Sequence, residues 1–154
     1  MLPPGGVPGG FRQVETVESV GSGGGVLSGS WNRVHNTIEL PPGSQPGREL
    51  VVVTTPDLRT ITPSTYRDVP PRLEGHRPLY AVGVLLQSGG RPVVDRRFVT
   101  LRLAGKEFTR ADFVLFFSTT RHGFVPAPKG HARCVNGHVV VRFRAGTELL
   151  VLGG

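Results

Sequence analysis

Short apolar segments of strand length recur along this chain and constrain its fold more than any other feature. Residues 34–40, 98–103 and 139–143 place apolar side chains at every second position, which is the period of a half-buried β-strand. No segment longer than about eleven residues keeps a helical apolar period. We expect strands within the ranges 34–40, 50–54, 80–87, 92–94, 98–103, 112–118, 134–139, 139–143 and 148–152.

Glycine and proline separate these segments. Gly89-Gly90 and Asn136-Gly137 suit the positive φ angles of tight hairpin turns. Many short strands joined by such turns predict an all-β fold, namely an antiparallel β-sandwich, a jelly roll or a β-barrel. We assign residues 31–154 to a single domain of this kind, with long proline-rich loops at 41–46 and 61–78.

The first thirty residues have a different composition. They are rich in glycine and carry thinly spread apolar side chains, so they bury too little apolar surface to offset the entropy lost on ordering. We therefore expect residues 1–30 to form an extended arm that lies against a partner, with Phe11, Val14 and Val17 as its anchors. The run 21–25 lacks the Lys-Ser/Thr of a phosphate loop and suits a flexible hinge.

The whole chain has a formal net charge of +7, with sixteen arginines against two lysines. This positive charge is concentrated in the second part of the chain. Arginine suits desolvated ion pairs at interfaces through its planar guanidinium fork. If their strands are neighbours, one basic strip would contain Arg91, Arg96, Arg97, Arg102, Arg142 and Arg144. Its partner could be an acidic protein surface, an anionic glycan or nucleic acid, and the lack of exposed aromatics among these arginines makes nucleic acid the weaker alternative.

Trp31 lies at the junction between the expected arm and the body. It could anchor the arm in a pocket, as interface aromatics do, or close one end of the core. Exposed Trp31, Tyr66 or Tyr80 would instead favour a glycan-binding or tail-fibre module. Both alternatives remain open at the level of sequence.

His122, His131, Cys134 and His138 form the one cluster of soft ligands, spaced H-x8-H-x2-C-x3-H. Four such ligands would satisfy tetrahedral zinc, but the spacing matches no common zinc pattern and only one thiolate is present. Surface histidines beside a buried cysteine are the default interpretation. We predict no metal, no cofactor and no catalytic residue, with an enzyme using His122, His131 and Cys134 as a further alternative.

Composition also bounds the setting of the protein. A single cysteine excludes an internal disulfide framework. No apolar run approaches the roughly 18 residues of a membrane helix, and the first residues lack the basic-then-apolar layout of a signal peptide. We therefore expect neither membrane insertion nor secretion.

Taken together, a small disulfide-free β body, a glycine-rich leader and long proline loops resemble the structural proteins of tailed-phage virions, in particular the capsid decoration, or cement, proteins. That resemblance covers the general plan of the whole chain and no residue motif. It implies a non-enzymatic virion component, assembled in the host cytoplasm, that stabilises a lattice. Its expected partners are other copies of itself, as a trimer, and a major capsid or other virion protein.

Overall fold

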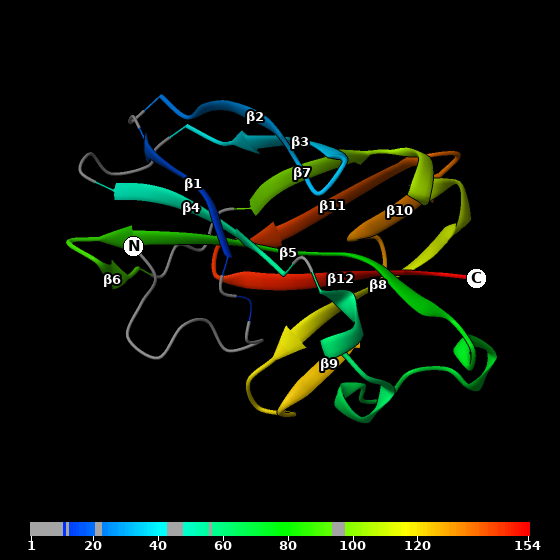
Figure 1. Cartoon of the computed structure of the whole chain (residues 1–154). Coiled ribbons are helices and arrows are strands. Elements are labelled where there is room, and N and C mark those ends of the chain that lie inside the picture. The colour runs from blue at the N-terminus through cyan, green and yellow to red at the C-terminus, as the bar shows by residue number, and fades with distance from the viewer. Residues whose placement is uncertain (1–10, 12, 21–22, 43–47, 56, 94–97) are drawn as a thin grey trace.

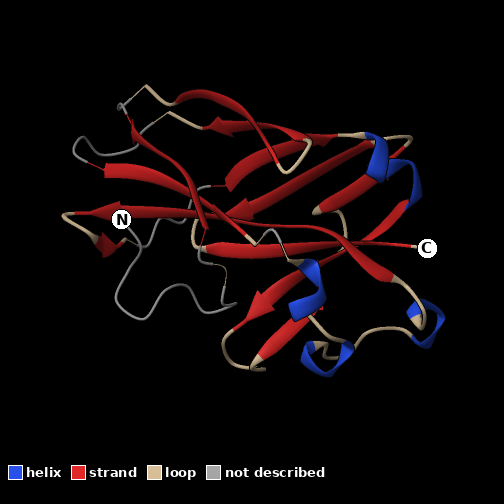
Figure 2. Cartoon of the chain, in the orientation of Figure 1, coloured by secondary structure: helices blue, strands red, loops and turns tan. Residues whose placement is uncertain are grey.

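The computed structural model places two antiparallel sheets face to face, joined by turns and short 3-10 segments (Figures 1 and 2). The residues that it describes are 11, 13–20, 23–42, 48–55, 57–93 and 98–154. No described strand belongs to both sheets, so the fold is the predicted β-sandwich and not the closed barrel. Within those residues, no helix is long and apolar enough to cross a bilayer.

The five-stranded sheet forms the upper layer in Figure 1 and has the strand order β10-β11-β7-β3-β2. Its strands are β2 (Gly25–Trp31), β3 (Val34–Leu40), β7 (Phe98–Ala104), β10 (Ala132–Val135) and β11 (His138–Arg144).

The seven-stranded sheet has the order β1-β4-β5-β12-β8-β9, and β6 also pairs with β5. Its strands are β1 (Gln13–Val20), β4 (Arg48–Thr54), β5 (Arg77–Ser88), β6 (Arg91–Pro92), β8 (Ala111–Ser118), β9 (Gly123–Pro126) and β12 (Thr147–Gly153). The 3-10 segments are η1 (Leu58–Thr60), η2 (Pro63–Thr65), η3 (Pro71–Leu73) and η4 (Lys106–Arg110).

Strands of the five-stranded sheet bury one face and expose the other. In β11, Val139, Val141 and Phe143 are buried, whereas the residues between them are exposed or half-buried. The inward side chains pack against the seven-stranded sheet in one apolar core. The period-two pattern in the sequence therefore reports a sheet with one solvated face.

The central strands β5 and β12 of the seven-stranded sheet are buried on both faces. All residues from Tyr80 to Gln87 in β5 are buried, and so are those from Glu148 to Gly153 in β12. Alternate residues of these strands belong to two different apolar clusters, one between the sheets and one on the outer face. Continuous apolar runs in the sequence correspond to this double coverage.

The outer cover comes from segments that the sequence assigns to loops and to the arm. Ile61 and Leu73, from the region of the 3-10 segments, are buried in the outer cluster. Phe11 is 1% exposed and its ring stacks on Phe124 of β9 at 6.1 Å between centroids. The proline-rich region 61–78 thus contributes to the core of its own chain.

The described part of residues 1–30 differs from the expected arm. Strand β1 pairs with β4 and strand β2 pairs with β3, so both belong to the sandwich, and the boundary at residue 30 falls inside β2. Backbone hydrogen bonds to existing strands stabilise these segments despite their glycine content. Residues 1–10, 12, 21 and 22 of the predicted arm lie outside the described residues.

A β-bulge explains why the sequence of β1 does not show a strand period. The register shifts between Val14 and Thr16, so Val14 pairs with Val53 and Val17 pairs with Val51. Because Val51 and Val53 both face the outer cluster, Val14 and Val17 share that face although they are three residues apart. An extra residue at a bulge produces this change of phase.

Both predicted hairpin turns are present. Asn136 and Gly137 have φ angles of 28° and 78°, and Gly89 and Gly90 have φ angles of 57° and 77°. A third tight turn joins β2 to β3 at Asn32 (φ 52°), which the sequence does not signal because its second residue is Arg33 (φ 68°) rather than glycine.

Candidate docking surface

The solvated face of the five-stranded sheet brings several predicted arginines together. Arg142 and Arg144 project from β11, and Arg102 projects from the neighbouring strand β7. Cross-strand pairs place Arg144 beside Phe98 and Arg142 beside Thr100, and paired residues of a ladder point to the same side. The condition that the sequence left open, that these strands are neighbours, is thus met.

Two of these guanidinium groups lie against one aromatic ring. The Cζ atom of Arg142 is 5.1 Å from the centroid of the Phe98 ring, and that of Arg144 is 5.5 Å away. The His131 ring meets the same ring edge-on at 5.4 Å. Arginine within about 6 Å of an aromatic face is held by cation–π attraction, so Phe98 positions both cations on the sheet.

Arg133 of β10 extends the positive charge of this face. It is exposed and pairs with Val140 of β11, while its neighbours Ala132 and Cys134 pack inward. We refer to Arg102, Arg133, Arg142 and Arg144, together with Phe98 beneath Arg142 and Arg144, as the cationic face. Nothing in the sequence marks Phe98 for this role, because a phenylalanine at the start of a strand is an ordinary strand residue.

Among the described residues, a carboxylate compensates this charge at one point. Glu39 of β3 accepts a hydrogen bond from Arg102 Nε at 2.8 Å. No carboxylate of the described residues lies within ion-pair distance of Arg133, Arg142 or Arg144. By contrast, Arg59 and Arg121, on other parts of the chain, pair with Asp57 and Asp68.

The chemistry of the cationic face is recognition of anions. Each guanidinium presents a planar fork of donors that matches a carboxylate, phosphate or sulfate in bidentate geometry. Because the groups stand on a sheet and not in a cleft, the surface fits an extended anionic partner better than a small enclosed ligand.

The other predicted arginines do not join this face. Arg91 is on β6, which pairs with β5 in the seven-stranded sheet. Arg96 and Arg97 lie outside the described residues.

The predicted anchors of the arm occupy other positions. Phe11 is a core residue of its own protomer, and Val17 is partly buried against the outer cluster. Val14 remains exposed at 38%. Trp31 is half-buried against the core between the sheets, and its ring covers Gly29, where a Cβ atom would clash with the ring.

The candidate metal ligands are not brought together. Cys134 pairs with Val139 and points inward, whereas His138 pairs with Val135 on the solvated face. His131 contacts Phe98 on that same face, and His122 lies in the β8–β9 turn. Among the residues that the structure describes, no three His, Cys, Asp or Glu side chains could hold a metal ion together.

A second polar group, unmarked in the sequence, lies near Cys134. His76 Nε2 is 2.8 Å from a carboxylate oxygen of Asp112, and Asp112 and Cys134 line one surface depression with Arg72 and Lys129. Burial raises the pKa of the Cys134 thiol, and the negative charge of Asp112 raises it further. A thiol that keeps its proton is a poor nucleophile and a poor metal ligand.

The aromatic side chains of the glycan alternative are not displayed as a platform. Tyr80 is 2% exposed, and its hydroxyl accepts a hydrogen bond from Asn36 Nδ2 at 3.1 Å. Tyr66 and Trp31 are half-buried. Tyr80 therefore does not meet the condition for the glycan alternative, because this residue lies in the core between the sheets.

Comparison with known proteins adds no relationship: no family model, curated protein or solved structure matches this chain.

Proposed function

We propose that this protein is a structural assembly protein that docks through its cationic face onto an acidic surface of a protein partner. In its most specific form, the proposal is that of a virion component, a capsid decoration protein that binds a major capsid or other virion protein. In this proposal the cationic face of the five-stranded sheet, and not an N-terminal arm, contacts the partner.

One observation carries the proposal. Arg142 and Arg144 are held against Phe98 on a solvated sheet face, and no described carboxylate neutralises them. Charges on a chain's own surface are commonly balanced or dispersed, and a fixed cluster of one sign attracts a partner of the opposite sign. Restricting both side chains before binding also reduces the entropy lost when a partner docks.

Acidic polypeptide serves as the probe for this surface. We expect the full chain to bind immobilised poly-L-glutamate, and the double variant Arg142→Ala/Arg144→Ala to bind about tenfold more weakly, because two charge-assisted contacts are lost. The matched control is Arg91→Ala/Arg110→Ala, which removes the same charge from exposed positions outside the cationic face. Equal losses in both variants would show that net charge alone governs binding and would overturn the proposal.

Two further probes separate the partner classes. Heparin carries sulfates and a single-stranded oligonucleotide carries phosphates, so both compete for the same guanidinium groups. Tighter, Arg142- and Arg144-dependent binding to either polymer than to poly-L-glutamate would replace the protein partner with a sulfated glycan or a nucleic acid.

The virion role has its own test. The native chain, purified from its source on a density gradient, should sediment with particles and not with free protein. Sedimentation as free protein would contradict the decoration role and leave the cationic face to another assembly.

A further inference from the structure

Strand β2 is an unusual edge strand because nothing in it discourages pairing. Natural sheets protect their edges with charges, prolines, bulges or short strands. The other edges here have such features: β1 has a bulge and two glutamates, β9 ends at Pro126, β10 is four residues long and contains Arg133, and β6 has two residues. Strand β2 has seven residues in regular register, with neither charge nor proline.

The β2–β3 turn fixes which backbone groups of β2 point outward. In a two-residue hairpin the closing pair, here Trp31 and Val34, is hydrogen bonded, and hydrogen-bonded pairs then alternate along the ladder. The residues between them, Val26, Ser28 and Ser30, therefore direct their N–H and C=O groups away from β3. No described strand pairs with them on that side.

A second copy of this chain fits this edge, which no described strand occupies, better than other occupants, because the strand is complementary to itself. An antiparallel pair centred on Ser28 places Val26 opposite Ser30 of the second copy and matches all three outward-directed residues. The same register sets Leu27 opposite Gly29 of the second copy, where the Trp31 ring supplies an apolar surface. Large thus meets small, and no like charges face each other.

The edge of the other sheet lacks this self-complementarity. In β1, an antiparallel pair centred on the strand would bring Glu15 opposite Glu18 of the second copy, and like charges directly opposite are destabilising.

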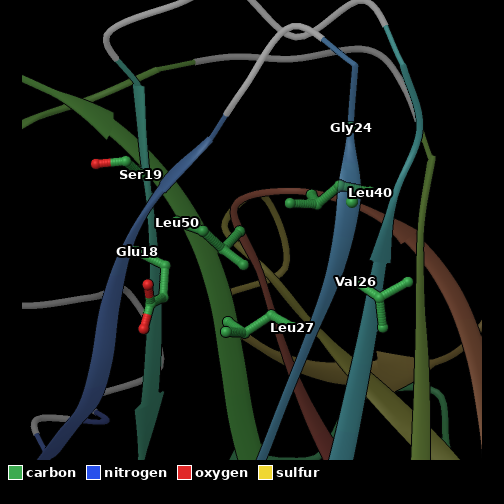
Figure 3. A pocket seen from close by; sticks show the side chains of 8 residues that line it. Glu18, Ser19, Gly24, Val26, Leu27, Leu40 and Leu50 are labelled. Carbon is green, nitrogen blue, oxygen red and sulfur yellow. The ribbon is translucent and has the colours of Figure 1, made fainter.

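Figure 3 shows two apolar side chains of β2 at this edge. Leu27 points towards Leu50 in a cleft of about 150 Å³ between β1 and β2, while Val26 points to the other side of its strand. Val26 is 68% exposed, more than Val14 or Val135, the other large apolar side chains that the described residues expose. Both side chains lie at the open edge of the five-stranded sheet.

We infer that two copies of this chain associate through β2, in antiparallel register about Ser28, to form one continuous sheet across a two-fold axis. The interaction surface consists of Val26, Leu27, Ser28, Ser30 and Trp31. This dimer replaces the trimer expected from the sequence and does not rest on the proposed function. It would place the cationic faces of the two copies towards opposite ends of the joined sheet and allow bivalent binding.

The oligomeric state of the full chain tests this inference. Light scattering after size exclusion should give a dimer for the natural protein. Val26→Lys should give a monomer, because it places a charge in the pairing edge, whereas Val135→Lys should remain a dimer. Val135 is the matched control, since it is an exposed valine on β10, the opposite edge of the same sheet.

A second variant guards against misfolding. Ser28→Pro removes an outward N–H that β3 does not use, so the β2–β3 ladder is retained and the pairing edge is blocked. Its circular dichroism spectrum should be that of the folded protein, and light scattering should show a monomer. Trp31 is the only tryptophan, so its fluorescence should shift to the blue and become less accessible to acrylamide as the natural protein associates.

A monomeric natural protein, a trimer, or equal effects of Val26→Lys and Val135→Lys would overturn the inference. So would a Ser28→Pro variant that is folded and still dimeric.

Discussion

The outer face of one sheet is buried by its own chain, whereas the outer face of the other sheet is exposed to solvent. The outer face of the seven-stranded sheet is covered by Phe11, by the region of the 3-10 segments and by Phe124, and its central strands β5 and β12 read as nearly unbroken apolar runs. The outer face of the five-stranded sheet carries arginines, threonines and histidines that meet solvent. Each sheet supplies one face to the shared core, so stability alone does not require this difference.

In a sandwich of this kind, the solvent-exposed outer face is the better place for a binding site. A face buried on its own chain is constrained by packing, and changes there cost stability. A face left in solvent is free to carry groups that serve a partner. The cationic face belongs to the second kind.

The largest expected effect is a difference in the free energy of unfolding between two Phe→Ala variants, one on each outer face. Phe11→Ala removes a ring that is 1% exposed on the outer face of the seven-stranded sheet, and we expect it to lower the free energy of unfolding by about 3–5 kcal/mol. Phe98→Ala removes a half-buried ring on the outer face of the other sheet and should cost about 1 kcal/mol or less. Urea unfolding of both variants measures the difference. Similar losses would mean that the two outer faces are equally covered.

A smaller effect is expected where a polar contact links the two sheets. Asn36 of β3 donates from Nδ2 to the Tyr80 hydroxyl of β5 and to the Val34 carbonyl. Tyr80→Phe leaves the buried amide with one partner fewer and should lower stability by about 1 kcal/mol near neutral pH. Chemical denaturation at neutral pH measures this loss, and an unchanged midpoint would contradict it.

The same residue gives a dependence on alkaline pH. Burial raises the pKa of Tyr80 above its ordinary value of 10.0, so the folded state keeps a proton that the unfolded state releases. Stability from this group is present below about pH 10 and falls as pH rises above that value. The natural protein should therefore lose more stability than Tyr80→Phe between about pH 8 and about pH 11. An identical loss in both proteins would show that ionisation of a group other than Tyr80 causes the loss of stability at alkaline pH.

Much of the fold could be predicted from the sequence because strand period and turn chemistry are local. The apolar segments and the Asn136-Gly137 turn indicated the class correctly. Strand β1 was missed because a bulge gives its valines a spacing of three, and β2 because glycine and serine interrupt its pattern.

The candidate site was predictable only in part. Arg102, Arg142 and Arg144 were expected to form a strip if their strands were neighbours, and strand order is a tertiary property that one sequence does not specify. The position of Phe98 under two guanidinium groups depends on that same pairing. The His and Cys cluster looked compact along the chain, but neighbouring residues of a strand point to opposite sides.

The most direct test of the central claim, that the solvated face of the five-stranded sheet is the docking surface, is an NMR titration of the ¹⁵N-labelled full chain with poly-L-glutamate. We expect amide shifts to concentrate in β7 and β11, around Phe98, Arg142 and Arg144. Shifts concentrated on the seven-stranded sheet or on its covering segments, or none at all, would contradict the account.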